Sequence, residues 1–303
     1  MPSPPVHGAR HTLLAGAVLA LVGCSLVIDS EQVQCETADD CAARGLSGAC
    51  VANVCVEQPL GTGGQGGGGG GGGASPWGCL GQVSWPDLDP ARTVTVRTRF
   101  QMTASQPIPD DITVKYCDNL DIDCASPLAD AIPIQADGWV SVDVPEGTRG
   151  YFDLSGPSIK PTLVYFPRPA QAEPPPTEDD PITLITPALF QGLVSAVGFQ
   201  EDPARGTLLV LTVDCTGNPA PGVRIASQQA DADATPFYFV NLTPSPDQTQ
   251  TDVSGFAGIL NLPPGLGTVE SRVASDDARI GVSSFQIRPG ALTNVAVEPT
   301  PVQ

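Results

Sequence analysis

The stretch TVTVRTRF at residues 93–100 decides the fold class, because apolar and polar side chains alternate along it. In an extended chain Val94, Val96 and Phe100 share one face, whereas Arg97 and Arg99 share the other. This period of two is typical of a β-strand with one buried face. Two further stretches alternate in the same way: ITVKY at residues 112–116 and WVSVDV at residues 139–144. The region therefore predicts a series of short strands.

Apolar runs of similar length fill the C-terminal part of the chain. They are GTLLVLTVDC (206–215), PGVRIAS (221–227), FYFVNL (237–242), VESRVAS (269–275), VSSFQI (282–287) and LTNVAVE (292–298). Turn-forming Pro, Gly, Asp and Asn separate the runs, and 32 prolines in the chain interrupt any long helix. The pattern predicts an all-β fold of Ig-like β-sandwiches.

Pairs of sequence signals recur at a spacing of roughly 110 to 120 residues, which indicates an internal repeat. PIPDDITVKYC, from Pro107, aligns with PAPGVRIAS, from Pro219, and DGWVSVDVPEG, from Asp137, aligns with DVSGFAGILNLPPG, from Asp252. We therefore predict two tandem sandwiches, at residues 77–170 and 205–303, rather than one large sandwich.

The segment between the two sandwiches, residues 171–204, combines a linker with one helix. RPAQAEPPPTEDDP at residues 168–181 is rich in Pro and acid and predicts an exposed linker. TPALFQGLVSAVG at residues 186–198 predicts a helix, because Thr186 can cap it and Pro187 suits the first helical position. Its apolar stripe consists of Leu189, Leu193, Val194 and Val197. A lone helix of this kind is more typical of a domain junction than of a functional site.

Residues 1–23 have the pattern of an export signal. The apolar run at residues 12–23 is shorter than the roughly 20 residues that a membrane-spanning helix needs. It ends in Leu21-Val22-Gly23-Cys24, which resembles the lipobox of bacterial lipoproteins. The resemblance implies cleavage before Cys24 and attachment of the new N-terminus to a membrane through acyl chains on the thiol.

The residue after Cys24 is Ser25, whereas Gram-negative lipoproteins that stay in the inner membrane carry Asp at this position. The same resemblance therefore implies a location in the outer membrane, facing the periplasm or the cell surface. Two alternatives stay open. One is an ordinary secreted protein that is cleaved elsewhere, with Cys24 at the boundary by chance. The other is a chain that retains the apolar run as a membrane helix.

Apart from Cys24 the chain contains eight cysteines, the even number that a disulfide framework in an oxidising compartment requires. They are Cys35, Cys41, Cys50, Cys55, Cys79, Cys117, Cys124 and Cys215.

The first four of these cysteines lie in residues 24–60, which are too few for a hydrophobic core and predict a small disulfide-rich segment. Three pairings are possible from the sequence. A resemblance to small knots of other surface lipoproteins favours Cys35 with Cys50 and Cys41 with Cys55. A four-thiolate zinc site is the alternative, although only Cys50 and Cys55 approach the usual ligand spacing.

Residues 61–76 are glycine-rich and predict a flexible linker, because glycine has no side chain to bury. The segment lacks the G-K-[ST] ending of a phosphate-binding loop.

Cys79 follows this linker, and Cys215 follows the first predicted strand of the second sandwich. We predict that these two cysteines bridge the sandwiches.

The stretch CDNLDIDC at residues 117–124 is predicted to be a loop closed by Cys117 and Cys124. Asp118, Asp121 and Asp123 within it are candidate calcium ligands, since Ca²⁺ prefers oxygen donors. Their spacing is not that of a helix-loop-helix calcium site, so a solvated turn is the default interpretation and no metal is predicted.

Composition excludes several classes of chemistry. Both histidines, His7 and His11, lie in the leader, so the cleaved chain lacks Ser-His, Cys-His and imidazole-metal arrangements. The net charge of −19 repels nucleic acid and anionic lipid, and we predict no nucleic-acid partner and no cofactor. The acid pairs Asp110-Asp111 and Asp276-Asp277 are candidates for a carboxylate-based polysaccharide hydrolase, the least favoured interpretation.

The last region resembles a known family, the carboxypeptidase regulatory-like domain, which is a transthyretin-like β-sandwich. The resemblance rests on NPAPGVRI (218–225), TDVSGFAGILNLPPG (251–265) and IRPGALTNVAVE (287–298). It implies a fold and an extracellular use without catalysis, and it transfers no active-site residues. In the first sandwich only the start at Pro107 and the stretch DGWVSVDVPEG fit, and CDNLDIDC departs from the family pattern.

Together these features predict a non-catalytic, lipid-anchored envelope or cell-surface protein. Its sandwiches would serve adhesion, scaffolding or envelope assembly, with an envelope protein or a glycan as partner. The alternative is a glycan-binding accessory module. Trp77, beside the linker, is its candidate ligand-binding residue, because tryptophan stacks on sugar rings. Trp85 and Trp139 are expected in the core.

Overall fold

The computed structural model describes residues 48–51, 54–57, 75–103, 106–172, 181–196 and 198–301. The chain divides into two compact units, residues 1–71 and 72–303. In the first unit β1 (Gly48–Val51) and β2 (Val54–Glu57) form an antiparallel pair, in which the backbone of Cys50 lies opposite that of Cys55. Cys24, Cys35 and Cys41 lie outside the described residues, so lipidation and the pairing within residues 24–60 stay predictions.

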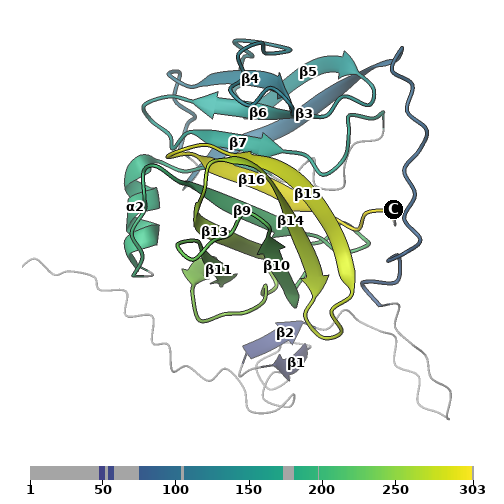
Figure 1. Ribbon diagram of the computed structural model, residues 1–303, viewed down its shortest axis with the longest axis vertical. Helices are drawn as coiled ribbons and strands as arrows, with labels where there is room; N and C mark the ends of the chain where they lie inside the picture. Colours follow the sequence, from purple (N-terminus) through teal and green to yellow (C-terminus); the bar gives the residue numbers. More distant parts are fainter. Residues whose placement is uncertain are drawn as a thin grey trace, which may run out of the picture. The chain divides into compact units, whose positions relative to one another are not determined.

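The second unit is built almost entirely of strands (Figure 1). Those before the helix are β3 (Thr93–Met102), β4 (Thr113–Asp118), β5 (Trp139–Pro145), β6 (Gly150–Ser155), β7 (Thr162–Tyr165) and β8 (Ile182–Leu184). Helix α2 (Pro187–Ala196) follows. After it come β9 (Gly206–Thr212), β10 (Val223–Ser227), β11 (Thr235–Val240), β12 (Thr243–Ser245), β13 (Phe256–Leu262), β14 (Gly265–Val273), β15 (Arg279–Ile287) and β16 (Leu292–Val297). The predicted all-β class is confirmed.

One pairing pattern occurs twice. In the first repeat, residues 93–184, β4, β6 and β7 form an antiparallel ladder, while β3 pairs with β5 antiparallel and with β8 parallel. In the second repeat, residues 206–297, β10, β14 and β15 form the ladder, while β9 pairs with β13 antiparallel and with β16 parallel. The internal sequence echo lies within these two repeats, while the predicted boundaries of two sandwiches at residues 77–170 and 205–303 stay predictions. Strand β8 lies within residues 171–204, where the sequence indicated a linker.

The two repeats share one sheet. Strand β7 of the first repeat pairs in parallel with β16 of the second, from Thr162 opposite Leu292 to Tyr165 opposite Val295. The result is an eight-stranded sheet in the order β12-β11-β13-β9-β16-β7-β6-β4, which crosses both repeats (Figure 1). All four residues of β7 are buried, as is typical of a parallel strand covered on both faces.

Burial follows the predicted alternation along β3. Val94, Thr98 and Phe100 are buried, whereas Arg97 and Arg99 on the opposite face are exposed. Each repeat encloses its own apolar cluster, and side chains from the end of β4 and from β6 and β7 join the cluster of the second repeat. The shared sheet therefore joins two sandwich cores rather than enclosing a single one.

Helix α2 has the local signals that the sequence predicted. The hydroxyl of Thr186 accepts a hydrogen bond from the Leu189 N–H at 3.2 Å, which caps the first turn. Phe190 and Val194 are buried and belong to the same apolar cluster as Phe237 of β11 and Leu260 of β13. An apolar cavity of about 80 Å³ remains beneath the helix. Among the residues that the structure places, no helix is long and apolar enough to cross a bilayer.

Candidate functional site: the Trp77 groove

The segment at residues 75–82 is fastened to the second repeat by a disulfide between Cys79 and Cys215, whose Cα atoms are 5.7 Å apart. The Cys215 N–H donates to the carbonyl of Pro76 at 3.1 Å. Within the segment, the N–H of Leu80 donates to the carbonyl of Trp77 at 3.1 Å, which continues a series of tight turns. The segment is thus held by a covalent bond and by its own backbone.

Trp77 and Leu80 lie against the end of the second-repeat core. Both side chains are partly buried and pack on an apolar cluster that includes Val223 at the start of β10 and Ile280 in β15. Packing of this kind fixes the orientation of the indole ring, because a large aromatic side chain in contact with a core has few alternative rotamers.

A groove of about 610 Å³ opens beside Trp77. This volume lies within the range of about 300–1,000 Å³ that is typical of small-molecule sites. Its lining comes from the segment at residues 75–80, the start of β10, the loop before β13 and the turn between β14 and β15. The polar lining side chains are Ser75, Gln250, Ser275 and Asp276, and all four are exposed.

The walls of the groove are fastened to each other through the backbone. The Gly222 N–H donates to the carbonyl of Thr251 at 2.8 Å, and the Gly222 carbonyl accepts from the Ala274 N–H at 2.8 Å. Gly222 has a φ of +74°, a region that suits glycine, and a Cβ atom built there would meet nothing within 4 Å. The groove is therefore a formed hollow with open space above Gly222.

The two acids at the β14–β15 turn, Asp276 and Asp277, make different contacts. Asp276 lines the groove, and its Oδ1 accepts from the Ala278 N–H at 3.0 Å. Asp277 instead forms ion pairs with Arg224 and Arg272, each at 3.1 Å. Two-carboxylate glycoside hydrolysis needs a pair of acids about 5–10 Å apart across the substrate. Among the described residues that line the groove, Asp276 is the one carboxylate.

The other acid pair named from the sequence lies in the first repeat. The carboxylate of Asp111 accepts a hydrogen bond from the Ser158 hydroxyl at 2.7 Å, and Asp110 is exposed beside it. Neither residue lines the Trp77 groove.

Cys117 and Cys124 form the second disulfide, with Cα atoms 5.5 Å apart, and close the loop that holds the three candidate calcium ligands. Asp118 accepts from the Leu120 N–H at 2.8 Å, and Asp121 accepts from the N–H groups of Ala125 and Ser126 at 3.0 and 2.8 Å. Two of the three carboxylates are thus used to shape turns.

The third aspartate of the loop, Asp123, is exposed. Among the described side chains, the group of potential metal ligands that lies close together consists of Cys117, Cys124 and Asp153, and the two cysteines are bonded to each other. The three aspartates of the loop do not form such a group there.

Arg288 fastens the same loop to the second repeat. Its guanidinium donates to the Ile122 carbonyl at 2.9 Å, to the Tyr151 hydroxyl at 2.7 Å and to the Asp153 carboxylate at 2.6 Å. The Tyr151 hydroxyl in turn donates to the Asp121 carbonyl at 2.7 Å. Burial raises the pKa of Tyr151 to about 12, so its hydroxyl remains a donor at neutral pH.

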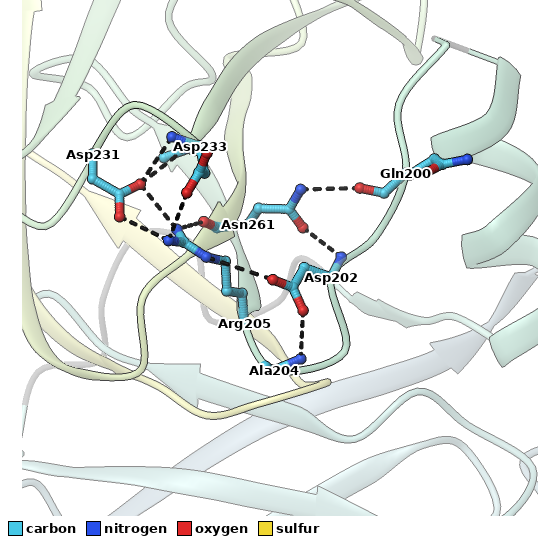
Figure 2. A network of polar contacts seen from close by, with 8 residues as sticks. Gln200, Asp202, Ala204, Arg205, Asp231, Asp233 and Asn261 are labelled. Atoms are coloured by element: carbon cyan, nitrogen blue, oxygen red, sulfur yellow. Dashed lines mark hydrogen bonds and ion pairs between the residues drawn. The ribbon is translucent and has the colours of Figure 1, made fainter.

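A second arginine occupies an acidic cluster that the sequence did not single out (Figure 2). Arg205 donates to both oxygens of Asp231, at 2.9 and 2.8 Å, and to Asp233 at 3.2 Å, while Asp202 lies 3.7 Å from its Nε. Hydrogen bonding to Arg205 lowers the pKa of Asp231 to about 2. The guanidinium pairs with the carboxylates of this cluster, so we assign the cluster a structural role.

Two of the three tryptophans differ from expectation. Trp85 and Trp139, expected in the core, are only partly buried. Trp139 lies on the outward face of β5, opposite Arg99, and the Arg97 guanidinium stacks over its ring at 4.7 Å. Position in the two-residue alternation thus outweighs the preference of tryptophan for the interior. Trp77 is also partly buried, and it lies at the edge of the groove.

The sequence carried three signals for this site: the tryptophan beside the linker, the expected link between Cys79 and Cys215, and the acid pair that contains Asp276. Nothing in the sequence marked Gln250 or Ser275, because single polar residues in loops are common. The groove is assembled from segments far apart in the chain, and a disulfide with a sequence separation of 136 brings the first of them into place.

Comparison with known protein families finds no matching family, and no curated protein matches the sequence. The lipobox and the carboxypeptidase regulatory-like resemblance therefore stay predictions.

Several solved structures of bacterial proteins show a weak likeness. The Bacillus anthracis TIE protein has 11% identity and a TM-score of 0.22, and the match covers 69% of this chain and 34% of that one. A streptococcal ancillary pilin has 13% identity and a TM-score of 0.21, with 68% of each chain covered. A family CBM26 module from Eubacterium rectale, solved with maltoheptaose, has 8% identity and a TM-score of 0.22, with 68% and 91% covered. The chain spans about a third of the first of these proteins, and TM-scores this low do not assign it to any of these groups.

Proposed function

We propose that this chain is a lipid-anchored, non-catalytic envelope protein that displays its two β-sandwich repeats for adhesion, scaffolding or envelope assembly. The observation that carries the proposal is the Cys79–Cys215 disulfide. It joins the first described residues after the glycine-rich segment to the second repeat, and such cross-links form and persist in oxidising compartments. A folded body fixed directly after a linker suits display at a distance from a membrane.

The groove supports a binding role, since it lies on the segment that follows the linker and is lined by exposed polar groups. The acidic surface keeps such a body soluble and away from anionic headgroups. Export, cleavage before Cys24 and acylation of its thiol belong to the same proposal.

Mass spectrometry of protein purified from its native host tests the anchor. We expect an N-terminal peptide that begins at acylated Cys24, and protease treatment of intact cells distinguishes surface from periplasmic display. The variant Cys24→Ser should appear in soluble fractions, with Cys35→Ser as a matched control that keeps the anchor. An unmodified thiol at Cys24 with the leader still attached would contradict the proposal.

A second candidate function is a glycan-binding accessory module. The observation that favours it is the position of Trp77 at the edge of a groove with four exposed polar side chains.

A further inference from the structure

We propose that the Trp77 groove binds a neutral oligosaccharide, with Trp77 as the stacking surface and Gln250 and Asp276 as the main hydrogen-bonding side chains. This inference rests on the second candidate function above, and it adds the ligand class and the residues that select it.

The first step concerns the aromatic residue. A sugar ring presents a face of C–H groups, and an indole held in a fixed orientation offers a matching apolar surface at low entropic cost. The Cys79–Cys215 disulfide and the packing of Leu80 on the core hold the Trp77 segment before any ligand arrives. Trp77 is therefore preorganised for stacking.

The second step concerns the polar lining. Sugar hydroxyls both donate and accept hydrogen bonds, so they suit a mixture of hydroxyl, amide and carboxylate groups. Ser75 and Ser275 supply hydroxyls, Gln250 supplies an amide and Asp276 supplies an acceptor. These residues come from three segments of the chain, so their groups approach a ligand from different sides.

The third step concerns charge. Among the described lining residues there is no Lys or Arg, and Asp276 is negative within a chain of net charge −19. Uronic acids and sulfated sugars would be repelled. An organic cation would be attracted to Asp276 and to the indole, but recognition of such ligands uses a cage of several aromatic rings. Trp77 is the one aromatic ring among the described lining residues, which favours a neutral sugar.

The test uses the full chain and isothermal titration with three kinds of probe. The first is a panel of neutral oligomers of glucose, xylose, mannose and N-acetylglucosamine. Oligogalacturonate is the anionic probe and choline the cationic probe. Trp77→Ala removes the stacking face, and Trp139→Ala is the matched control, because Trp139 is also partly buried but lies on β5, outside the groove lining.

Two further variants separate the contributions. Gly222→Asn fills the groove, because asparagine tolerates a positive φ and its side chain would meet open space. It also keeps the test decisive if Trp77→Ala does not fold. Asp276→Asn removes the charge but keeps the shape of the side chain.

We expect at least one neutral oligomer to bind, with affinity about tenfold or more weaker in Trp77→Ala and in Gly222→Asn, and unchanged in Trp139→Ala. Asp276→Asn should retain binding of that oligomer within about tenfold. The inference is overturned if no neutral oligomer binds, if binding is insensitive to both groove variants, or if choline alone binds and Asp276→Asn abolishes it. Surface exposure on intact cells is measured independently, so a protein that is displayed but binds no sugar refutes the inference and leaves the lipid-anchored function standing.

Discussion

The two repeats share one pattern of strand pairing, to which the second adds β11 and β12, but they differ at the edge where the groove lies. In the second repeat, the start of β10 and the β14–β15 turn leave a hollow that residues 75–82 complete. In the first repeat, the start of β4 and the turn between β6 and β7 occupy the corresponding edge and contact each other. A Cβ atom at Gly156 would lie 2.6 Å from the Asp111 carbonyl oxygen, and Ser158 is hydrogen-bonded to the Asp111 side chain.

The difference shows how a duplicated scaffold gains a site in one copy. Both repeats supply the same framework of strands, and neither framework contains Trp77, because that residue precedes the first strand of the first repeat. A segment outside the repeated pattern, joined by a long-range disulfide, makes the second copy suitable for a ligand. The predictions below test this comparison.

The largest effect is expected from Cys79→Ala combined with Cys215→Ala. A cross-link with a sequence separation of 136 restricts the unfolded chain strongly. Its loss should lower the free energy of unfolding by about 3–5 kcal/mol, measured by denaturant titration. The indole of Trp77 should become more exposed to fluorescence quenchers. An unchanged unfolding midpoint would show that the segment is held by packing alone.

Cys117→Ala combined with Cys124→Ala tests the first repeat in the same way. This loop spans a separation of only 7 residues, so we expect a smaller loss of about 2 kcal/mol. Tryptophan quenching at the groove should not change, because the loop lies in the other repeat. If this pair were as costly as the long-range one, loop length would not explain the stabilisation.

Arg288→Met tests the polar contact between the repeats. Methionine keeps an unbranched apolar stem but leaves the Asp153 carboxylate and the Ile122 carbonyl without their charged partner. We expect the free energy of unfolding to fall by about 1–2 kcal/mol. Arg279→Met is the control, since Arg279 is half exposed and lies 3.7 Å from Glu270, and exposed pairs contribute little. Equal effects in the two variants would refute a linking role for Arg288.

The smallest effect concerns acid stability at the Arg205 cluster of the second repeat. The pKa of Asp231 is lowered from 3.8 to about 2 in the folded chain, so its stabilising contribution is complete above the unfolded value. That contribution is lost as the pH falls from about 4 to about 2. The melting temperature of Asp231→Asn should therefore depend less on pH in this window than that of the parent chain. Arg205→Met should reduce the dependence similarly, and parallel curves in all three proteins would contradict the assignment.

Local features of the fold were predictable from the sequence. The alternation at residues 93–100 gives β3 and its buried face, and the cap at Thr186 and Pro187 gives the start of α2. Each of these features depends on interactions between residues a few positions apart, so a local sequence pattern is enough to predict it.

The shared sheet and the groove were not predictable in the same way. The parallel pairing of β7 with β16 joins residues about 130 positions apart. The sequence marks LTNVAVE, which contains β16, as an apolar run, but it does not single out residues 162–165, which form β7. Trp77 was named as a candidate from its place beside the linker, whereas Gln250 and Asp276 became neighbours of it only through folding. The cysteine count indicated disulfides, but positions alone could not show that the Cys79–Cys215 bond builds a groove wall.

The same disulfide decides how the molecule carries mechanical load. The chain from Cys79 to Cys215 forms a covalent ring, and all strands of the first repeat lie inside it. Consider a force applied to the N-terminal side of Cys79 while the second repeat is held. This force is transmitted through the disulfide bond and not through the chain inside the ring. The first repeat would thus stay folded under tension that reaches its neighbour directly.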